Sequence, residues 1–449
     1  MDNQEALRHD KISKLLVKYS IPAILAMLVT SLYNTVDRAF IGSIEGVGAL
    51  AISGLGVTMP IFTIIVGFGV LIAVGGSTNI SIKLGAKEKD DAEKVLGNTL
   101  MLAIIIAIMI MILGTLFIDK ILYLFGASEH TITYARDYIG VIFLGTPFNL
   151  ISFSLNNAIR AEGNPKLAAK TMIVGCILNL ILDPIFIFGL GLGIKGAAIA
   201  TVLCQVVIFL WVLSYFVTKR SSLELKKENL KLDYKIVKII IAVGMAPFLM
   251  EMATGIMHVI TNTSLKVYGG DFAIGAMTAV TSISLLFMMP VFGLSQGMQT
   301  IIAYNYGAKQ YDRSKKALNL AIICAVIILT IGFILIKIFP EFFIGIFNKD
   351  KELTKLAIKG INMNLFTLPI ASIAIIGPVY FQCIGKAKQS MFLILLRQFI
   401  VLIPLILILP KFLNLNGVWL AQPISDIISV IIVLIFLNKE FKNDNKNIK

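Results

Sequence analysis

The sequence predicts an all-α membrane protein with twelve transmembrane helices in two six-helix lobes, related by a pseudo-two-fold axis along the membrane normal. Three observations support this fold class: the composition, the length of the apolar runs and an internal repeat. Of the 449 residues, 57% are hydrophobic and 15% are charged. Soluble domains are about 45–50% apolar and about 25% charged. A soluble chain of this length cannot bury so much apolar surface, so apolar side chains must also face lipid.

Continuous apolar runs account for most of the chain. Each run reaches the roughly 20 residues that an α-helix needs to cross the hydrocarbon core. Membrane strands would be shorter and would alternate between apolar and polar residues, and these runs do not alternate. The predicted segments are 15–41, 47–82, 93–117, 131–158, 166–188, 196–217, 237–265, 274–305, 317–339, 354–382, 389–409 and 417–437.

The two halves of the chain resemble each other. LGAK at 84–87 matches YGAK at 306–309, and RAEGNPK at 160–166 matches QCIGKAK at 382–388, both at an offset of 222 residues. The basic linker 218–236 separates an N-lobe, 1–217, from a C-lobe and basic tail, 237–449. Because each half has six segments and the linker is cytoplasmic, the repeats are predicted to be parallel.

The positions of Lys and Arg predict the orientation. With both termini inside, 27 of these residues fall in cytoplasmic loops and tails and 8 in outside loops. Cytoplasmic loops carry the excess of positive charge in membrane proteins. We therefore expect a multi-pass protein of the cell membrane with both termini in the cytoplasm. The net charge of +14 reflects this topology and does not indicate a nucleic-acid partner.

Two carboxylates stand inside predicted spans, Asp37 in the first and Asp183 in the fifth. An acid near the bilayer centre costs about 2.5–3.5 kcal/mol to insert, so such residues are functional candidates. Tyr138 and Thr201 fall at a similar depth in neighbouring spans, and Asn179 precedes Asp183 by one helical turn. Together these side chains predict a polar site in the outer half of the N-lobe.

Structural interpretations of the same residues stay open. Asp37, next to Arg38, could lie hydrated at the membrane interface, and Tyr138 could be an interfacial aromatic residue. Asn179 could join helices by a hydrogen bond. Further polar residues follow the same helix faces, and for Asn149 and Asn156, taken singly, helix packing is favoured over a substrate contact. The further polar residues are Thr30, Asn34, Asn149 and Asn156.

The C-lobe keeps the scaffold and lacks counterparts of both acids. Asp37 corresponds to Asn262 at a local offset of 225, and Asp183 falls near Leu405 at the offset of 222. The C-lobe instead has Glu251, with His258 at helical spacing from it. We consider a second ion or substrate site and an acid in a wet cleft equally compatible with this pattern.

Nothing in the sequence indicates catalysis. The chain has no P-loop, no HExxH motif and no Ser/His/Asp set, and its glycine runs lack the strand–turn–helix context of nucleotide binding. Close helix packing explains the glycines better. We expect no enzyme activity and no cofactor.

With these features together, the sequence resembles the MATE family of multidrug and toxin extrusion transporters, which have the MATE/MOP fold. The most specific motifs are RAEGNPK after the fourth span and ILNLILDPIFIFG in the fifth. With the acid in the first span, they are most similar to the DinF-like branch, close to MepA-type bacterial exporters. The resemblance covers nearly the whole chain and implies an ion-coupling site formed by Asp37, Asp183, Asn179, Tyr138 and Thr201. Glu251 is a departure, because it has no partner Asp on the tenth span.

The resemblance implies export of cationic, amphipathic compounds by antiport with H⁺ or Na⁺. The expected partners are these drugs and membrane lipids, and we expect a monomer. A bound Na⁺ would be held by Asp37, Asp183, Asn179 and Thr201. The candidate substrate cavity comprises Thr30, Asn34, Asn149, Asn156, Gln205, Glu251, His258 and Met288.

Two other functions remain to be distinguished. A lipid-linked oligosaccharide flippase of the same superfamily would have about fourteen spans and a cationic cavity, and the sequence shows twelve spans with few basic residues inside them. An ion channel would conduct without counter-transport, and the two-lobe repeat argues against it.

Overall fold

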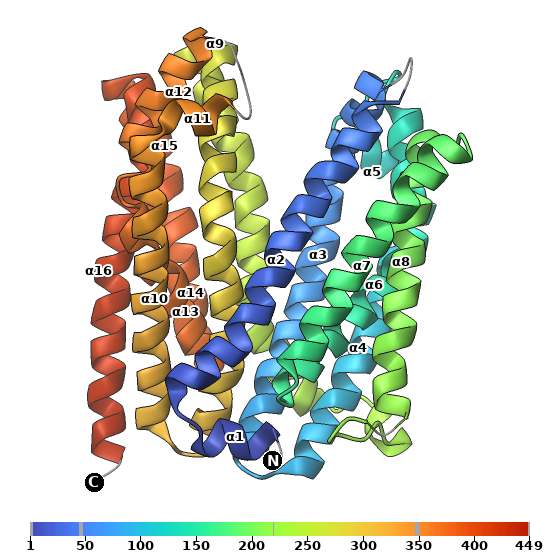
Figure 1. Ribbon diagram of the computed structural model, residues 1–449, viewed down its shortest axis with the longest axis vertical. Helices are drawn as coiled ribbons and strands as arrows, with labels where there is room; N and C mark the ends of the chain where they lie inside the picture. The colour runs from blue at the N-terminus through green and yellow to red at the C-terminus, as the bar shows by residue number, and fades with distance from the viewer. Residues whose placement is uncertain (1–2, 45–47, 219, 346–350, 448–449) are drawn as a thin grey trace. The chain divides into compact units, whose positions relative to one another are not determined.

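The computed structural model describes residues 3–44, 48–218, 220–345 and 351–447. Within these ranges all regular structure is helical (Figure 1). Three basic residues used in the charge count, Lys219, Lys349 and Lys449, lie outside the described ranges, as does residue 219 of the predicted linker.

The chain forms two compact units. The first comprises Met1–His9 and Leu25–Glu251, and the second comprises Asp10–Ile24 and Met252–Lys449. The first part of the first long helix therefore packs within the second unit, and the first part of the seventh span packs within the first.

The first unit is built around α6 (Ile132–Ala161), which contacts α3, α4, α7 and α8. These neighbours bring the fourth span into contact with most of its unit. The helices from the start of the chain to the linker are α1 (Asn3–His9), α2 (Ile12–Gly42), α3 (Gly48–Gly85), α4 (Lys89–Leu116), α5 (Ile118–Leu124), α6, α7 (Pro165–Pro184), η1 (Ile185–Gly189), α8 (Gly193–Val217) and η2 (Lys227–Leu230).

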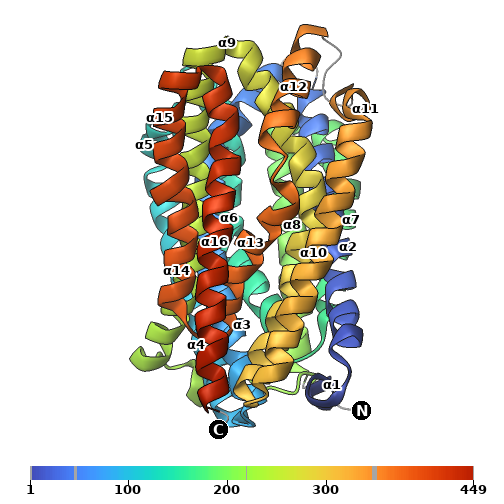
Figure 2. The ribbon, with the colours of Figure 1, turned by 90° about the vertical axis from the view of Figure 1, so that its left-hand side faces the viewer.

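In the second unit, α13 (Leu368–Cys383) packs between α10 (Tyr311–Ile338) and α16 (Leu415–Asn447), and Figure 2 shows these helices side by side. The remaining elements from the linker onward are α9 (Tyr234–Gly307), α11 (Pro340–Gly345), α12 (Lys351–Asn364), α14 (Ala387–Leu395), η3 (Leu396–Leu402) and α15 (Ile403–Leu413).

The number of spans agrees with the sequence. Eleven described helices are long and apolar enough to cross a membrane, and a twelfth span forms if Thr354–Asn364 and Leu368–Cys383, bent by 56°, count as one. The long α9 contains two of these spans, which meet at Gly270, where φ is 67°. Glycine tolerates this left-handed conformation because it has no Cβ.

The repeat detected in the sequence is also present in the backbone. Lys87 and Lys309, which end the two matching turns, both have positive φ, at 66° and 58°. Gly163 and Gly385, in the other matched pair of loops, have φ of 108° and 75°. Positive φ is uncommon outside glycine. Two halves that place it at the same repeat positions have retained the same local fold.

Glycines allow helices to approach closely in both units. A methyl group on Gly244 of α9 would lie 1.9 Å from the carbonyl oxygen of Leu71 on α3. In the second unit, a methyl group on Gly293 would lie 2.6 Å from the Cα of Ile24. Small residues at such crossings let helix backbones pack against each other in a membrane.

The inter-lobe linker is docked against the first unit through two buried acids. Glu162 accepts hydrogen bonds from Ser221 Oγ (2.5 Å) and from the backbone N–H of Ser222 (3.1 Å). Glu93 forms an ion pair with Lys226 at 2.6 Å. The linker is therefore held against the first unit by hydrogen bonds and an ion pair, together with the buried side chain of Leu223.

Candidate functional site

The two acids predicted to form the site lie together inside the first unit. Asp37 is on α2, close to its end, and Asp183 is the last residue but one of α7. Their exposed fractions are 7% and 0%. Their carboxyl groups lie close to each other. Since two ionised carboxylates can only accept, this contact becomes favourable when a proton or another cation is shared between them.

The local sequence explains why Asp183 is held so firmly. The side chain of Asn164 caps α7 by accepting from the N–H of Leu167 at 3.3 Å, and Pro165 occupies the first helical turn. Pro184 ends the regular helix, and the π-helical turn η1 follows it. Proline cannot donate to the helical ladder, and π turns occur frequently at functional sites. Asp183 thus lies where the helix changes its winding.

Two further predicted residues complete a chain of polar contacts. Asn179 Nδ2 donates to Asp183 Oδ1 at 3.1 Å and lies 3.5 Å from Thr201 Oγ1 on α8. Asn179 is 2% exposed and Thr201 is 9% exposed. The sequence prediction that Asn179 shares one helix face with Asp183 agrees with this geometry, while the role of Asn179 and Thr201 in ion coupling stays a prediction.

This cluster has more acceptors than donors. Asp37 Oδ1, Asp183 Oδ2 and Asn179 Oδ1 are buried and find no donor among the described residues. A buried oxygen without a partner costs free energy, so a site with three of them is incomplete as it stands. A proton or a hard cation such as Na⁺ would supply what is missing. The described residues contain no group of three metal-ligating His, Cys, Asp or Glu side chains, so a transition-metal site is not supported.

Two tyrosines border the acids. Tyr138 of α6, which the sequence singled out, is 9% exposed and lies close to Asp37 and Asp183. Tyr33 of α2 also lies close to both acids and to Thr201, and it lines the adjoining cavity. Tyr33 was not among the predicted site residues, although its position one helical turn before Asp37 was the signal that could have found it.

Arg38 does not draw Asp37 to the surface. The Arg38 side chain is exposed and its Nη2 contacts the sulfur of Met59 at 3.8 Å, while the Asp37 side chain is buried. Successive residues of a helix point in different directions, so the two neighbours serve different environments. The alternative in which Asp37 lies hydrated at the interface does not fit this burial.

A cavity of about 290 Å³ adjoins the acids in the first unit. Five of the predicted substrate-cavity residues line it, together with Asn179 and Thr201 from the polar cluster. These five are Thr30, Asn34, Asn149, Asn156 and Gln205.

Not all of these polar groups are available to a ligand. Asn156 Nδ2 donates to the carbonyl of Ala168 (2.9 Å) and to Thr171 Oγ1 (2.7 Å), so the packing interpretation fits this residue. Gln205 Oε1, in contrast, is buried and has no donor among the described residues. Gln205 therefore remains the better candidate for contact with a ligand.

The three predicted C-lobe residues of the substrate cavity do not lie in one cavity. His258 lines a cavity of about 300 Å³ within the second unit, whereas Glu251 and Met288 line neither of these two cavities. Glu251 was the acid predicted for the C-lobe, and Asp426 was not predicted. Asp426 of α16 is buried in the second unit, 4% exposed, and forms an ion pair with Arg397 at 2.9 Å. Its signal was an acid inside the last apolar run, flanked by PIS and IIS.

Comparison with known proteins identifies the family. The family model described as MatE matches residues 22–185 and 246–408, one match in each half of the chain. The chain belongs to the MATE family. The two matches correspond to the two repeats, and the first of them contains both Asp37 and Asp183.

MATE relatives cover almost the entire chain. It is 27% identical over 432 residues to the multidrug export protein MepA of Staphylococcus haemolyticus, covering 95% of this chain and 94% of that protein. The MepA protein of Staphylococcus saprophyticus is also 27% identical, covering 95% of both chains.

Solved MATE structures share the fold. An outward-facing multidrug resistance MATE family transporter of the MOP superfamily matches with a TM-score of 0.93 and 25% identity, over 99% of each chain. A MOP superfamily transporter from Pyrococcus furiosus matches equally well, with a TM-score of 0.93. This MATE chain therefore shares the fold of multi-pass membrane transporters over nearly all of its residues, as its apolar helices predict.

Proposed function

We propose that this chain is a secondary multidrug exporter that expels cationic, amphipathic compounds in exchange for H⁺ or Na⁺. The coupling ion binds at Asp37 and Asp183, with Asn179, Thr201 and Tyr138 completing the site. Relatives that cover the whole chain are multidrug export proteins. The observation that carries the proposal is the pair of buried carboxylates beside a cavity that shares Asn179 and Thr201 with them.

The ion supplies the charge that the site lacks. Burial makes an ionised carboxylate costly, so the empty pair favours taking up a cation. A proton satisfies the contact between the carboxyl groups, and Na⁺ satisfies it through the oxygens of Asp37, Asp183, Asn179 and Thr201. The membrane potential contributes about 2.3 kcal/mol per charge per 100 mV to this uptake from outside.

The adjoining cavity suits an amphipathic cation. It combines aromatic and thioether side chains, Phe62, Phe153 and Met172, with amides and hydroxyls. Methionine and aromatic surfaces adapt to ligands of different shapes. Since the cavity shares Asn179 and Thr201 with the acids, ion uptake changes the hydrogen bonds and the negative charge that a cationic drug meets. Ion and drug thereby exclude each other.

The remaining expectations follow from the topology. We place the chain in the cell membrane with both termini in the cytoplasm, acting as a monomer among membrane lipids. Glu93 and Glu162, the two acids that hold the linker, would then lie on the cytoplasmic side, where the basic linker runs.

Transport in proteoliposomes tests the proposal. Purified protein is given an imposed pH gradient or Na⁺ gradient, one at a time, and ethidium movement is followed by fluorescence. Asp183→Asn and Asp37→Asn should each reduce gradient-driven transport by at least about tenfold, the effect of losing about 1.4 kcal/mol of coupling. Asp119→Asn is the matched control, because Asp119 is half exposed in a surface ion pair with Arg136. Wild-type transport and wild-type gradient dependence in both acid variants would reject the site.

A further inference from the structure

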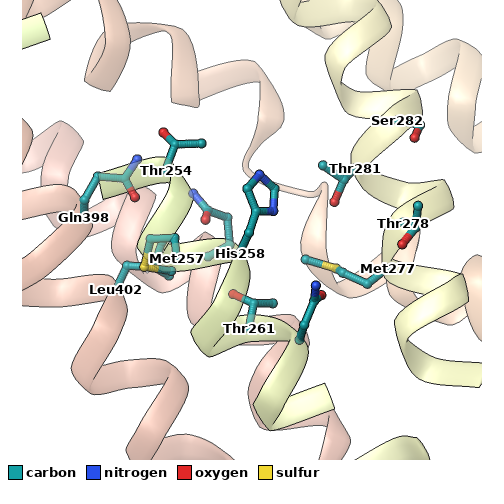
Figure 3. A pocket seen from close by; sticks show the side chains of 12 residues that line it. Thr254, Met257, His258, Thr261, Met277, Thr278, Thr281, Ser282, Gln398 and Leu402 are labelled. Carbon is teal, nitrogen blue, oxygen red and sulfur yellow. The ribbon is translucent and has the colours of Figure 1, made fainter. Parts of the chain in front are cut away.

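The cavity of the second unit is lined by both polar and apolar side chains. Its volume is about 300 Å³, and hydroxyls, amides and one imidazole line it together with Met257, Met277 and Leu402. In Figure 3, His258 lies between Thr254 and Gln398 on one side and Thr278 and Thr281 on the other. These side chains come from both spans of α9 and from η3, so the lining is assembled by tertiary structure.

This cavity is the repeat counterpart of the one beside the acid pair. His258 corresponds to Tyr33 at the offset of 225, and Gln398 corresponds to Cys176 at the offset of 222. Gln422 corresponds to Thr201 at the offset of 221. The two units therefore place a cavity at the same point of the same fold, with different chemistry around it.

Asp426, an acid buried in the second unit, is already neutralised. Asp426 Oδ1 accepts from Arg397 Nε (3.0 Å) and from Gln422 Nε2 (3.1 Å), and its Oδ2 lies 3.4 Å from Thr367 Oγ1. The Arg397 and Asp426 side chains are 13% and 5% exposed. Gln422 stands between this ion pair and the cavity, because it both lines the cavity and donates to the acid.

We propose that this cavity is a binding site for an uncharged, hydrogen-bonding group, such as an alcohol or an amide, and that Arg397 sets this preference by acting as the fixed counter-ion of Asp426. No carboxylate lines the cavity. It offers a cation no opposite charge, and it offers a neutral polar group both donors and acceptors. Desolvating a cation here would be uncompensated.

The proposal goes beyond the exchange of drug and ion at the acid pair. It assigns the second unit a ligand class of its own, and binding there does not require Asp37 or Asp183. If ion coupling at the acid pair is disproved, binding in the second unit can still be observed. If binding in the second unit is disproved, ion coupling at the acid pair is unaffected.

A pair of matched probes tests the preference directly. Choline and 3,3-dimethylbutan-1-ol have the same shape and the same hydroxyl, and differ by one positive charge. Their binding to the purified full-length chain is measured by saturation-transfer NMR at a fixed pH, in an Asp37→Asn/Asp183→Asn background that removes the charge of the other site. We expect the alcohol to bind and choline to bind at least tenfold more weakly. Gln398→Leu, which leaves the ion pair untouched, should abolish the specific alcohol signal.

Removing Arg397 should reverse the order of the probes. In Arg397→Gln, the charge of Asp426 has no counter-ion and should favour binding of choline over the alcohol. Adding Asp426→Asn to this variant should remove the gain in choline binding. Arg397→Lys keeps the counter-ion and should keep the alcohol preference, which also guards against a fold defect in the glutamine variant. Equal binding of both probes with Arg397 present, or an alcohol signal unaffected by Gln398→Leu, would overturn the proposal.

Discussion

The two units of this transporter solve the same electrostatic problem in different ways. In the first unit, Asp183 is fully buried and accepts a hydrogen bond from the neutral amide of Asn179. In the second unit, Asp426 is also buried, and the guanidinium of Arg397 neutralises it. Asp426 occupies the repeat position of Gln205, at the offset of 221.

The difference shows how one fold can yield an exchangeable site and a fixed one. A buried acid without a counter-charge must acquire a proton or an ion from outside, so its state depends on the solution. A buried acid with a tethered guanidinium is compensated by the chain itself, so its state does not. A duplicated scaffold therefore needs only a few side-chain changes to confine ion coupling to one half.

Neutralising one acid from each unit should have opposite effects on stability, and this is the largest expected contrast. Asp426→Asn leaves Arg397 buried without its partner and should lower the free energy of unfolding by about 3–5 kcal/mol. Asp183→Asn removes a buried charge that lacks a counter-charge and should not lower it. Thermal melting of both variants in the same detergent checks the contrast. A drop in the melting temperature that is equal for the two would break the comparison.

The docked linker should respond to pH through Glu162. Burial is the largest influence on this side chain and raises the pKa of Glu162 above its ordinary value. The folded state then binds the proton more tightly than the unfolded state, so docking is strongest at low pH and weakens as pH rises from the ordinary pKa through the raised one. Limited proteolysis between Lys226 and Lys227 across this interval should show faster cleavage at the higher pH.

A matched substitution separates the titration of Glu162 from its hydrogen bonds. Glu162→Gln cannot ionise, so its cleavage rate should lose the pH dependence. Glu162→Ala leaves the Ser221 and Ser222 donors unpaired and should weaken docking by about 1–3 kcal/mol at all pH values. A Gln variant with the wild-type pH profile would show that another group titrates.

Tyr33→Phe should sharpen the description of the ion site. The substitution removes a hydroxyl that lies close to Asp37, Asp183 and Thr201 and keeps the ring. If that hydroxyl forms one hydrogen bond in the ion-loaded site, its loss costs about 0.5–1.5 kcal/mol. Gradient-driven ethidium transport should fall roughly two- to tenfold at unchanged melting temperature. An unaffected transport rate would place the Tyr33 hydroxyl outside the site.

The smallest effect on stability and transport is expected when Arg397 and Asp426 are replaced together. Buried ion pairs can often be exchanged for apolar residues at little cost, because both desolvation penalties disappear together. Arg397→Leu/Asp426→Leu should therefore melt near the wild-type temperature and keep its ion-driven transport. Loss of the gradient dependence in this variant would show that the second unit takes part in ion coupling.

The residues near Asp183 show how far prediction from sequence reached. Asp37, Asp183 and Asn179 could be found because an acid in an apolar run is costly and because helical spacing puts Asn179 on the same face. Tyr33 and Asp426 were missed, since their significance depends on which other helices they meet. Glu251 is also an acid inside an apolar run and so fitted the pattern for a C-lobe site, but it lines neither of the two cavities.

By itself the sequence determined the membrane class, the number of spans and the repeat. Each of these follows from runs and offsets along the chain, and the bilayer requires helices of a given length. Tertiary structure alone decided which buried acid has a counter-charge. That depends on whether a guanidinium from another helix comes within about 3 Å, a distance that only packing between helices sets.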